Sequence, residues 1–171
     1  MIFSRKYTLE EVKGLLQIYR GNQAITGVNS VNSTVQRSPA AAHAHIHGGA
    51  NFLEQRARVN TPGEPRKTGT YWSEQDQAAA TLEVLNSDNG RIALRQLDIG
   101  ESSAVMEAYL TPGRFRVASA QDASQGVLGR NNPARAHAGS INSQGFASKG
   151  FVKVVKGVGG QLQIQTSFPI V

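Results

Sequence analysis

Three of the four histidines lie close together in the sequence, at His43, His45 and His47. Because alternate residues of a strand face the same way, a strand here would present all three imidazoles on one side, as a metal site requires. However, no acidic or thiol side chain adjoins them as a fourth ligand, and the Ala-rich and Gly-rich setting is also typical of a solvated loop. A third interpretation is acid–base catalysis, since the unperturbed pKa of histidine, about 6.5, suits proton transfer near neutral pH.

Cleavage of RNA without a metal requires a base for the 2′-hydroxyl proton, an acid for the 5′ leaving oxygen, and donors that stabilise charge on the phosphorane. His47 can act as base or acid, and the Thr166 hydroxyl can donate a hydrogen bond. Arg56 and Arg58 are cations that could stabilise the charge. An early helix or loop laid across the last strands would bring these distant residues together. His137 is a second acid–base candidate, for which a solvated loop histidine is the alternative.

Positive charge is concentrated in the C-terminal third of the chain. The whole sequence has 18 Lys and Arg against 12 Asp and Glu, a formal net charge of +6. Between Ala108 and Val171 there are seven basic residues and one acid, Asp122, so this third alone carries the same excess. A basic sheet face suits a polyanion such as nucleic acid, and an ordinary solubilising surface is the alternative.

Length and composition limit the class of protein. At 171 residues, one domain with an accessory segment can bury a core without disulfides. The chain has no cysteine, which excludes disulfide frameworks, thiolate zinc sites and cysteine nucleophiles. No apolar run approaches the roughly 20 residues of a membrane helix, and the first residues lack the apolar region of a signal peptide. We therefore expect no membrane insertion.

The segment from Gly150 to Val171 predicts two strands around a glycine-rich turn. Apolar and polar residues alternate along 162–165, and the glycines between 157 and 160 supply the positive φ angles of a tight reversal. Proline cannot donate to a strand ladder, so we expect pairing to stop at Pro169. The hydroxyls and the ring just before it would then lie at a sheet margin.

Helices are expected earlier in the chain. Thr8 and Glu11 form a capping box before an apolar helical face that should pack on the main body. Ser73 is the N-cap of a second expected helix, over residues 74–85, with acids in its first turn. Trp72, just before it, is expected to be a core or helix-packing residue in preference to a base-stacking platform.

The segments between this helix and the terminal hairpin are less regular. Residues 91–97 are ambiguous between helix and strand, and 103–110 look weakly helical. An alternating strand is expected at 114–118, followed by a long surface loop over 122–145. The sequence therefore predicts an α+β protein, with N-terminal helices packed on a C-terminal antiparallel β-sheet. We divide it into an N-terminal helix and linker, 1–40, and a nuclease domain, 41–171.

The order of these segments resembles a known family. An early His-Gly-Gly segment, an alanine-rich helix after Thr-Tyr-Trp-Ser, a Phe-Val-Lys-Val-Val strand and a terminal Gln-Thr-Ser-Phe-Pro strand resemble the RNase A-like toxin domains at the C-termini of bacterial contact-dependent inhibition proteins. More broadly, the chain is similar to the barnase/EndoU/RelE-type nuclease fold. The resemblance covers residues 43–171, and its most specific part is the terminal Thr-Ser-Phe-Pro.

The resemblance implies a catalytic histidine at His47, with His45 as the alternative, and an arginine at Arg58 or Arg56. It also implies a role for the terminal-strand threonine, Thr166. The chain departs from the family's pattern twice. Phenylalanine replaces the usual tyrosine of the last strand, which keeps a ring but loses a hydroxyl, and alanine follows the Gly-Gly pair where the family has its histidine.

We therefore predict a metal-independent, toxin-like endoribonuclease that needs no cofactor and cleaves RNA by transesterification to a 2′,3′-cyclic phosphate. The predicted catalytic residues are His47, Arg58 and Thr166, and the predicted substrate-binding residues are His45, Arg56, Lys153 and Phe168. The expected partners are an RNA substrate and an acidic cognate immunity protein. Secretion, or delivery into a target-cell cytoplasm, is expected, with cytoplasmic residence as the alternative. The alternative functions are a non-catalytic nucleic-acid-binding or assembly protein, and a metalloprotein that uses the histidine cluster.

Overall fold

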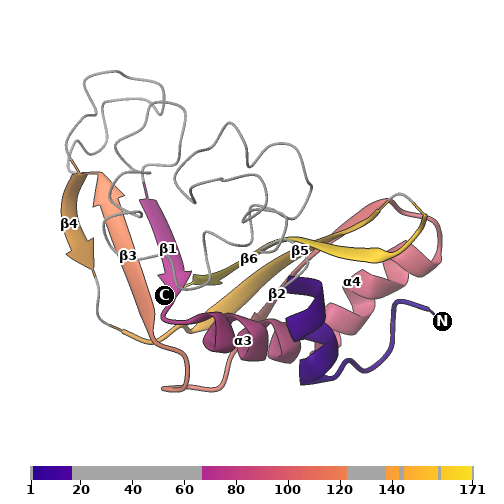
Figure 1. Cartoon of the computed structure of the whole chain (residues 1–171), viewed down its shortest axis with the longest axis horizontal. Coiled ribbons are helices and arrows are strands. Elements are labelled where there is room, and N and C mark those ends of the chain that lie inside the picture. Colours follow the sequence, from indigo (N-terminus) through magenta and orange to yellow (C-terminus); the bar gives the residue numbers. More distant parts are fainter. Residues whose placement is uncertain (1, 17–66, 123–137, 143–144, 158, 171) are drawn as a thin grey trace.

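The computed structural model describes residues 2–16, 67–122, 138–142, 145–157 and 159–170. These residues contain a short N-terminal helix, over 9–16, and two antiparallel three-stranded sheets in the orders β1-β3-β4 and β2-β5-β6 (Figure 1). The other elements are α3 (Glu74–Asn86), α4 (Asp88–Asp98), β1 (Lys67–Tyr71), β2 (Ser103–Tyr109), β3 (Val117–Asp122), β4 (Ala138–Asn142), β5 (Lys149–Lys156) and β6 (Leu162–Ile170).

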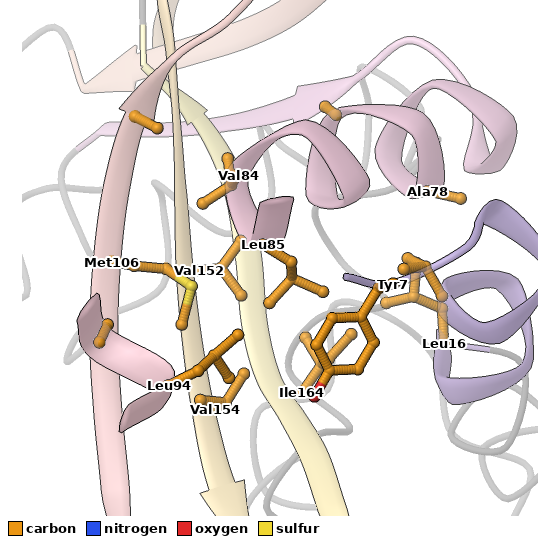
Figure 2. Packing of buried hydrophobic residues seen from close by; sticks show 14 of the residues in the cluster. Tyr7, Leu16, Ala78, Val84, Leu85, Leu94, Met106, Val152, Val154 and Ile164 are labelled. Carbon is orange, nitrogen blue, oxygen red and sulfur yellow. The ribbon is translucent and has the colours of Figure 1, made fainter. Parts of the chain in front are cut away.

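The helices lie against one face of the β2-β5-β6 sheet (Figure 1). Val152, Val154 and Ile164 from this sheet are fully buried, as are Leu85 of α3 and Leu94 of α4, and Figure 2 shows these side chains converging. Helices therefore precede the C-terminal strands and pack on them, which confirms the α+β prediction. The helix expected over 74–85 is also confirmed, and its N-cap Ser73 accepts a hydrogen bond from the Asp76 amide.

The N-terminal helix packs on the main body as expected, because Val12 and Leu16 belong to the core. The capping box is present, with Thr8 N donating to Glu11 Oε1 at 3.2 Å and Glu11 N donating to Thr8 Oγ1 at 3.3 Å. The segment before it is tied to the ends of α3 and α4. The expected domain boundary near residue 40 lies outside the described residues and stays a prediction.

The side chains of Asp98 and Asn86 hold the segment before the N-terminal helix by hydrogen bonds to its backbone. The Asp98 carboxylate accepts hydrogen bonds from the amides of Phe3 and Ser4, at 2.8 and 2.9 Å. The Asn86 amide accepts from Tyr7 N at 2.8 Å and donates to Tyr7 O at 2.9 Å. Asn86 thus satisfies both backbone groups of one residue, as a neighbouring strand would. The segment before the N-terminal helix is therefore held in place by side chains that lie 79 to 95 positions away in sequence.

The weak helical expectation for 103–110 is wrong, because this segment forms β2. Its burial alternates, with Ala104, Met106 and Ala108 buried and the residues between them exposed. This period of two is that of a strand with one covered face, and pairing with β5 secures it. The ambiguous 91–97 segment lies in α4.

The expected end of pairing at Pro169 is also wrong. β6 continues to Ile170, with Pro169 opposite Gly150. In the order β2-β5-β6, β6 is an edge strand, and an edge tolerates a residue without a backbone N–H. The strand expected at 114–118 begins later, at Val117, and β4 lies within the expected 122–145 loop.

Candidate functional site

The structure describes three of the seven predicted site residues. Thr166 and Phe168 lie on β6, and Lys153 lies on β5. The others lie outside the described residues, as does His137, so their placement stays a prediction: His45, His47, Arg56 and Arg58. The structure therefore places only the C-terminal half of the predicted site, and the roles of these residues stay predictions.

A β-bulge at Gln165 decides which way Thr166 points. Val154 pairs with Ile164 and Lys153 pairs with Thr166, so Gln165 is an extra residue in β6. Ile164 faces the helices, and regular alternation would turn Thr166 the same way. The extra residue instead turns Thr166 to the face opposite the helices, which we call the outer face. Bulges re-aim side chains in this manner and are enriched at sheet edges and active sites.

The Thr166 hydroxyl is the most informative atom on the outer face. The residue is only 8% exposed, yet Oγ1 has no hydrogen-bond partner among the described residues. The adjoining Gln165 Oε1 is likewise buried without a partner in this part of the chain. Buried polar groups are nearly always paired, and leaving one unpaired costs about 1–3 kcal/mol. An acceptor or donor from a ligand would remove this cost, so the two atoms mark a candidate binding point.

The pairs along β5 and β6 place a cation and two rings beside this hydroxyl. Lys153 is directly opposite Thr166, and Phe151 is directly opposite Phe168. The two phenylalanine rings stack with centroids 4.7 Å apart and an interplanar angle of 21°. One side of the Phe168 ring therefore faces Phe151 and is closed to a base.

The cations of the outer face differ in their surroundings. Lys149 contacts the Glu107 carboxylate at 3.6 Å, and its ammonium lies 4.8 Å from the centroid of the Tyr109 ring. Lys153 makes no ion pair with another described residue. Among the described residues, its charge is therefore available beside Thr166, where it would stabilise an anionic group.

Buried hydrogen bonds to α3 hold the Thr166 strand in position. Ser167, the next residue, points to the opposite face, and its carbonyl oxygen accepts from Gln77 Nε2 at 3.0 Å. The hydroxyl oxygens of Ser167 and Thr81 are 2.7 Å apart. All three residues are completely buried. The bulge and this network together fix the backbone from which Thr166 projects.

The described residues include no group of three or more His, Cys, Asp or Glu that could hold a metal ion. The histidine cluster at 43–47 lies outside them, so the metal interpretation stays a prediction. Over the same described ranges, no helix has the length and apolarity needed to cross a bilayer.

The core placement expected for Trp72 is wrong, whereas the alternative, a helix-packing residue, stays a prediction. Its side chain is 53% exposed and its ring lies 4.8 Å from the Arg116 guanidinium carbon, so it is not a core residue. The neighbouring Tyr71 is fully buried instead, and burial raises the pKa of its phenol well above the ordinary value. Alternation along β1 could have revealed this, because only one of two successive aromatic residues can face the core.

Comparison with known proteins gives one weak likeness. No family model matches the chain, and no curated protein matches it. Among solved structures, the chain is similar to one in the crystal structure of a CdiA-CT/CdiI complex from Y. kristensenii, with 13% sequence identity and a TM-score of 0.49. The match covers 74% of this chain and 96% of that one. At this identity and score, the likeness does not establish a family or a function.

Proposed function

We propose that the protein is a metal-independent endoribonuclease whose substrate lies on the outer face of the β2-β5-β6 sheet. The observation that carries the proposal is the bulge at Gln165. It directs a buried Thr166 hydroxyl, unpaired among the described residues, to the position opposite the Lys153 cation. A hydroxyl donor beside an ammonium group is suited to a phosphate whose negative charge grows during reaction.

The reaction is a transesterification within the RNA chain. The 2′-oxygen attacks the adjacent phosphorus, the bond from phosphorus to the 5′-oxygen breaks, and a 2′,3′-cyclic phosphate remains. A base takes the 2′-hydroxyl proton and an acid gives a proton to the 5′-oxygen. We assign proton transfer to His47, stabilisation of the phosphorane to Arg58 and Thr166, and further substrate contacts to Lys153 and Phe168.

The resemblance of the sequence to toxin domains extends the proposal to a toxin role. Such a protein would need a cognate immunity partner. Because the C-terminal third carries seven basic residues against one acid, a partner that covers this region would be acidic.

The direct test is incubation of the purified protein with total RNA in the presence of a chelator. We expect RNA fragments that end in a 2′,3′-cyclic phosphate, and no cleavage of DNA, which lacks the 2′-hydroxyl. His47→Ala should abolish cleavage. Intact RNA after incubation with the parent, or equal cleavage by the parent and His47→Ala, would refute the mechanism.

Thr166→Val tests the described half of the site. Valine keeps the shape of threonine and removes a hydroxyl that has no partner among the described residues. We therefore expect cleavage to fall by about tenfold or more, the effect of losing one transition-state hydrogen bond, while the free energy of unfolding stays equal or rises. Thr166→Ser should restore much of the cleavage. A Thr166→Val protein that is destabilised but cleaves normally would show that the hydroxyl is structural.

Binding without catalysis is the second candidate function. The described groups of the outer face, a hydroxyl, cations and rings, are groups that bind a nucleic acid, and none of them is a histidine. This alternative predicts salt-sensitive binding of RNA with no product under any condition. Retained affinity together with intact RNA would select it over the ribonuclease.

A further inference from the structure

Three side chains form a row across the end of the β1-β3-β4 sheet, on neighbouring stretches of backbone. Trp72 N donates a hydrogen bond to the Arg116 carbonyl oxygen at 3.0 Å, and Arg116 pairs with Phe146 in an antiparallel bridge. The residues next to the row, Tyr71 and Ala147, are buried at 0% and 1% exposure. Because side chains alternate along extended backbone, the row points to the opposite side, away from the core. We call Trp72, Arg116 and Phe146 the Trp–Arg–Phe row.

The Trp–Arg–Phe row is exposed to solvent and includes the positive charge of Arg116. The Trp72 side chain is 53% exposed and that of Phe146 is 47% exposed. Arg116 stands between them in the ladder, with its guanidinium carbon 4.8 Å from the centroid of the Trp72 ring. It makes no ion pair with another described residue. Two large rings, and a cation without an ion pair among the described residues, are thus exposed together on neighbouring stretches of backbone.

We propose that the Trp–Arg–Phe row is a stacking platform for the bases of a single-stranded nucleic acid. Every base has a flat face that can stack on an exposed ring, and arginine stacks as well while it attracts phosphate. Arg116 and Phe146 belong to the C-terminal third, whose excess charge equals that of the whole chain, so a polyanion is favoured over a neutral protein surface. The inference rests on the proposed function only in taking a nucleic acid as the ligand.

The backbone links the row to the candidate site. From Phe146 the chain runs through Ala147, which pairs with Phe115, into β5, which begins at Lys149. At roughly 3.3 Å per residue, Lys149 lies about 10 Å along the chain from the row. Lys149 contacts the Tyr109 ring, which is 79% exposed. A second pair of ring and cation, Tyr109 and Lys149, therefore lies on the outer face at the end of β5 that follows the row in sequence.

The chain offers a direct probe, because Trp72 is its only tryptophan. Stacking of a base on an indole quenches its fluorescence, so a titration with a single-stranded oligodeoxynucleotide reports contact with the row itself. DNA is chosen because it lacks the 2′-hydroxyl and resists cleavage by the proposed reaction, while stacking tolerates either sugar. We expect quenching that saturates, that weakens with added salt, and that a DNA duplex does not produce.

Substitutions make the test quantitative. Trp72→Ala and Phe146→Ala should each weaken binding of a fluorescein-labelled oligodeoxynucleotide, measured by anisotropy, by about 5- to 150-fold. Trp72→Phe should restore most of the affinity because it keeps a ring. Ile99→Ala is the matched control, since Ile99 is also exposed, at 72%, but is the C-cap residue of α4 and not a member of the row. It should leave both binding and the unfolding midpoint unchanged.

The outcomes separate this inference from the proposed ribonuclease. Quenching and the two weakened variants support the platform even if RNA is never cleaved. Absence of quenching at low salt overturns it, even if RNA is cleaved. Equal quenching by duplex DNA or by inorganic polyphosphate would show attraction by charge alone and would also overturn it. Unchanged affinity in both Trp72→Ala and Phe146→Ala would do the same, and would leave the row as a surface for another kind of partner.

Discussion

Ser167→Ala should destabilise the protein less than Thr81→Val, although the two residues share one hydrogen bond. Thr81 Oγ1 lies 2.6 Å from the Gln77 carbonyl oxygen and 2.7 Å from Ser167 Oγ. A carbonyl can only accept, so the single hydroxyl proton of Thr81 goes to Gln77. Ser167 must then be the donor to Thr81. The direction of this hydrogen bond follows from counting protons.

The magnitudes follow from what each substitution leaves behind. Ser167→Ala removes a donor, while Thr81 still donates to Gln77, so the loss is that of an ordinary hydrogen bond, about 1 kcal/mol. Thr81→Val keeps the shape of the side chain but leaves the Ser167 hydroxyl in a site with 0% exposure and without its acceptor. Desolvation of that hydroxyl adds to the loss, for a total of about 2–3 kcal/mol. The double variant removes the stranded hydroxyl and should be no less stable than Thr81→Val.

Urea unfolding of the parent, the two single variants and the double variant at one pH gives their free energies of unfolding and the coupling energy between Thr81 and Ser167. Thr81→Ser is the control, because it retains the hydroxyl and should recover most of the stability lost in Thr81→Val. The proton assignment is refuted if Ser167→Ala costs as much as Thr81→Val. It is also refuted if the double variant loses the sum of the two single losses.

Three other positions give predictions. Hydrogen bonds from Ser4, and then from the Phe3 amide, lower the pKa of Asp98 from 3.8 to about 2. Since this folded-state pKa is depressed, the stabilisation is complete above about pH 4 and is lost as the pH falls towards 2. Asp98→Asn should therefore have a lower urea midpoint than the parent at neutral pH, and the difference should shrink over that window. A Cβ at Gly150 would lie 2.7 Å from the Val84 side chain, so Gly150→Ala should lower the free energy of unfolding in urea by about 1–3 kcal/mol. A Cβ at Gly14, in the N-terminal helix, would have nothing within 4 Å, and alanine favours a helix over glycine. Gly14→Ala should therefore raise the free energy of unfolding by up to about 1 kcal/mol.

Much of the fold could be predicted because its signals are local. The capping box at Thr8, the N-cap at Ser73 and the strand expected from the alternation over 162–165 each depend on one element, and all three are confirmed. The segment over 103–110 misled because alanine and methionine favour helices, and because its period of two is in its burial and not in its hydropathy, since Val105 and Tyr109 are apolar and exposed. Pairing with β5 stabilises this segment as a strand. Propensity was overridden by a long-range partner that no local window contains.

The candidate site was less predictable, for a related reason. Residue type and the family resemblance point to Thr166, and residue type points to Lys153, but their direct opposition depends on the bulge at Gln165. A bulge is an extra residue in one strand relative to its partner, so it cannot be predicted from the sequence of one strand alone. The exposure of Trp72 likewise depends on which of the two adjacent aromatic side chains, Tyr71 or Trp72, packs into the core. The roles of His47 and Arg58 stay predictions.

The extra residue in β6 also determines how the strand would respond to a change of length. Deleting Gln165 would leave only Thr166 between Ile164 and Ser167, and regular alternation would then keep Ile164 and Ser167 on the core side and Thr166 on the outer face. The deletion would therefore remove the bulge, with its local bend and twist, without turning over either half of the strand. A substitution of Gln165 keeps the extra residue and therefore the bulge. Among homologous sequences, loss of one residue at this position should thus be compatible with the same pairing of β5 and β6.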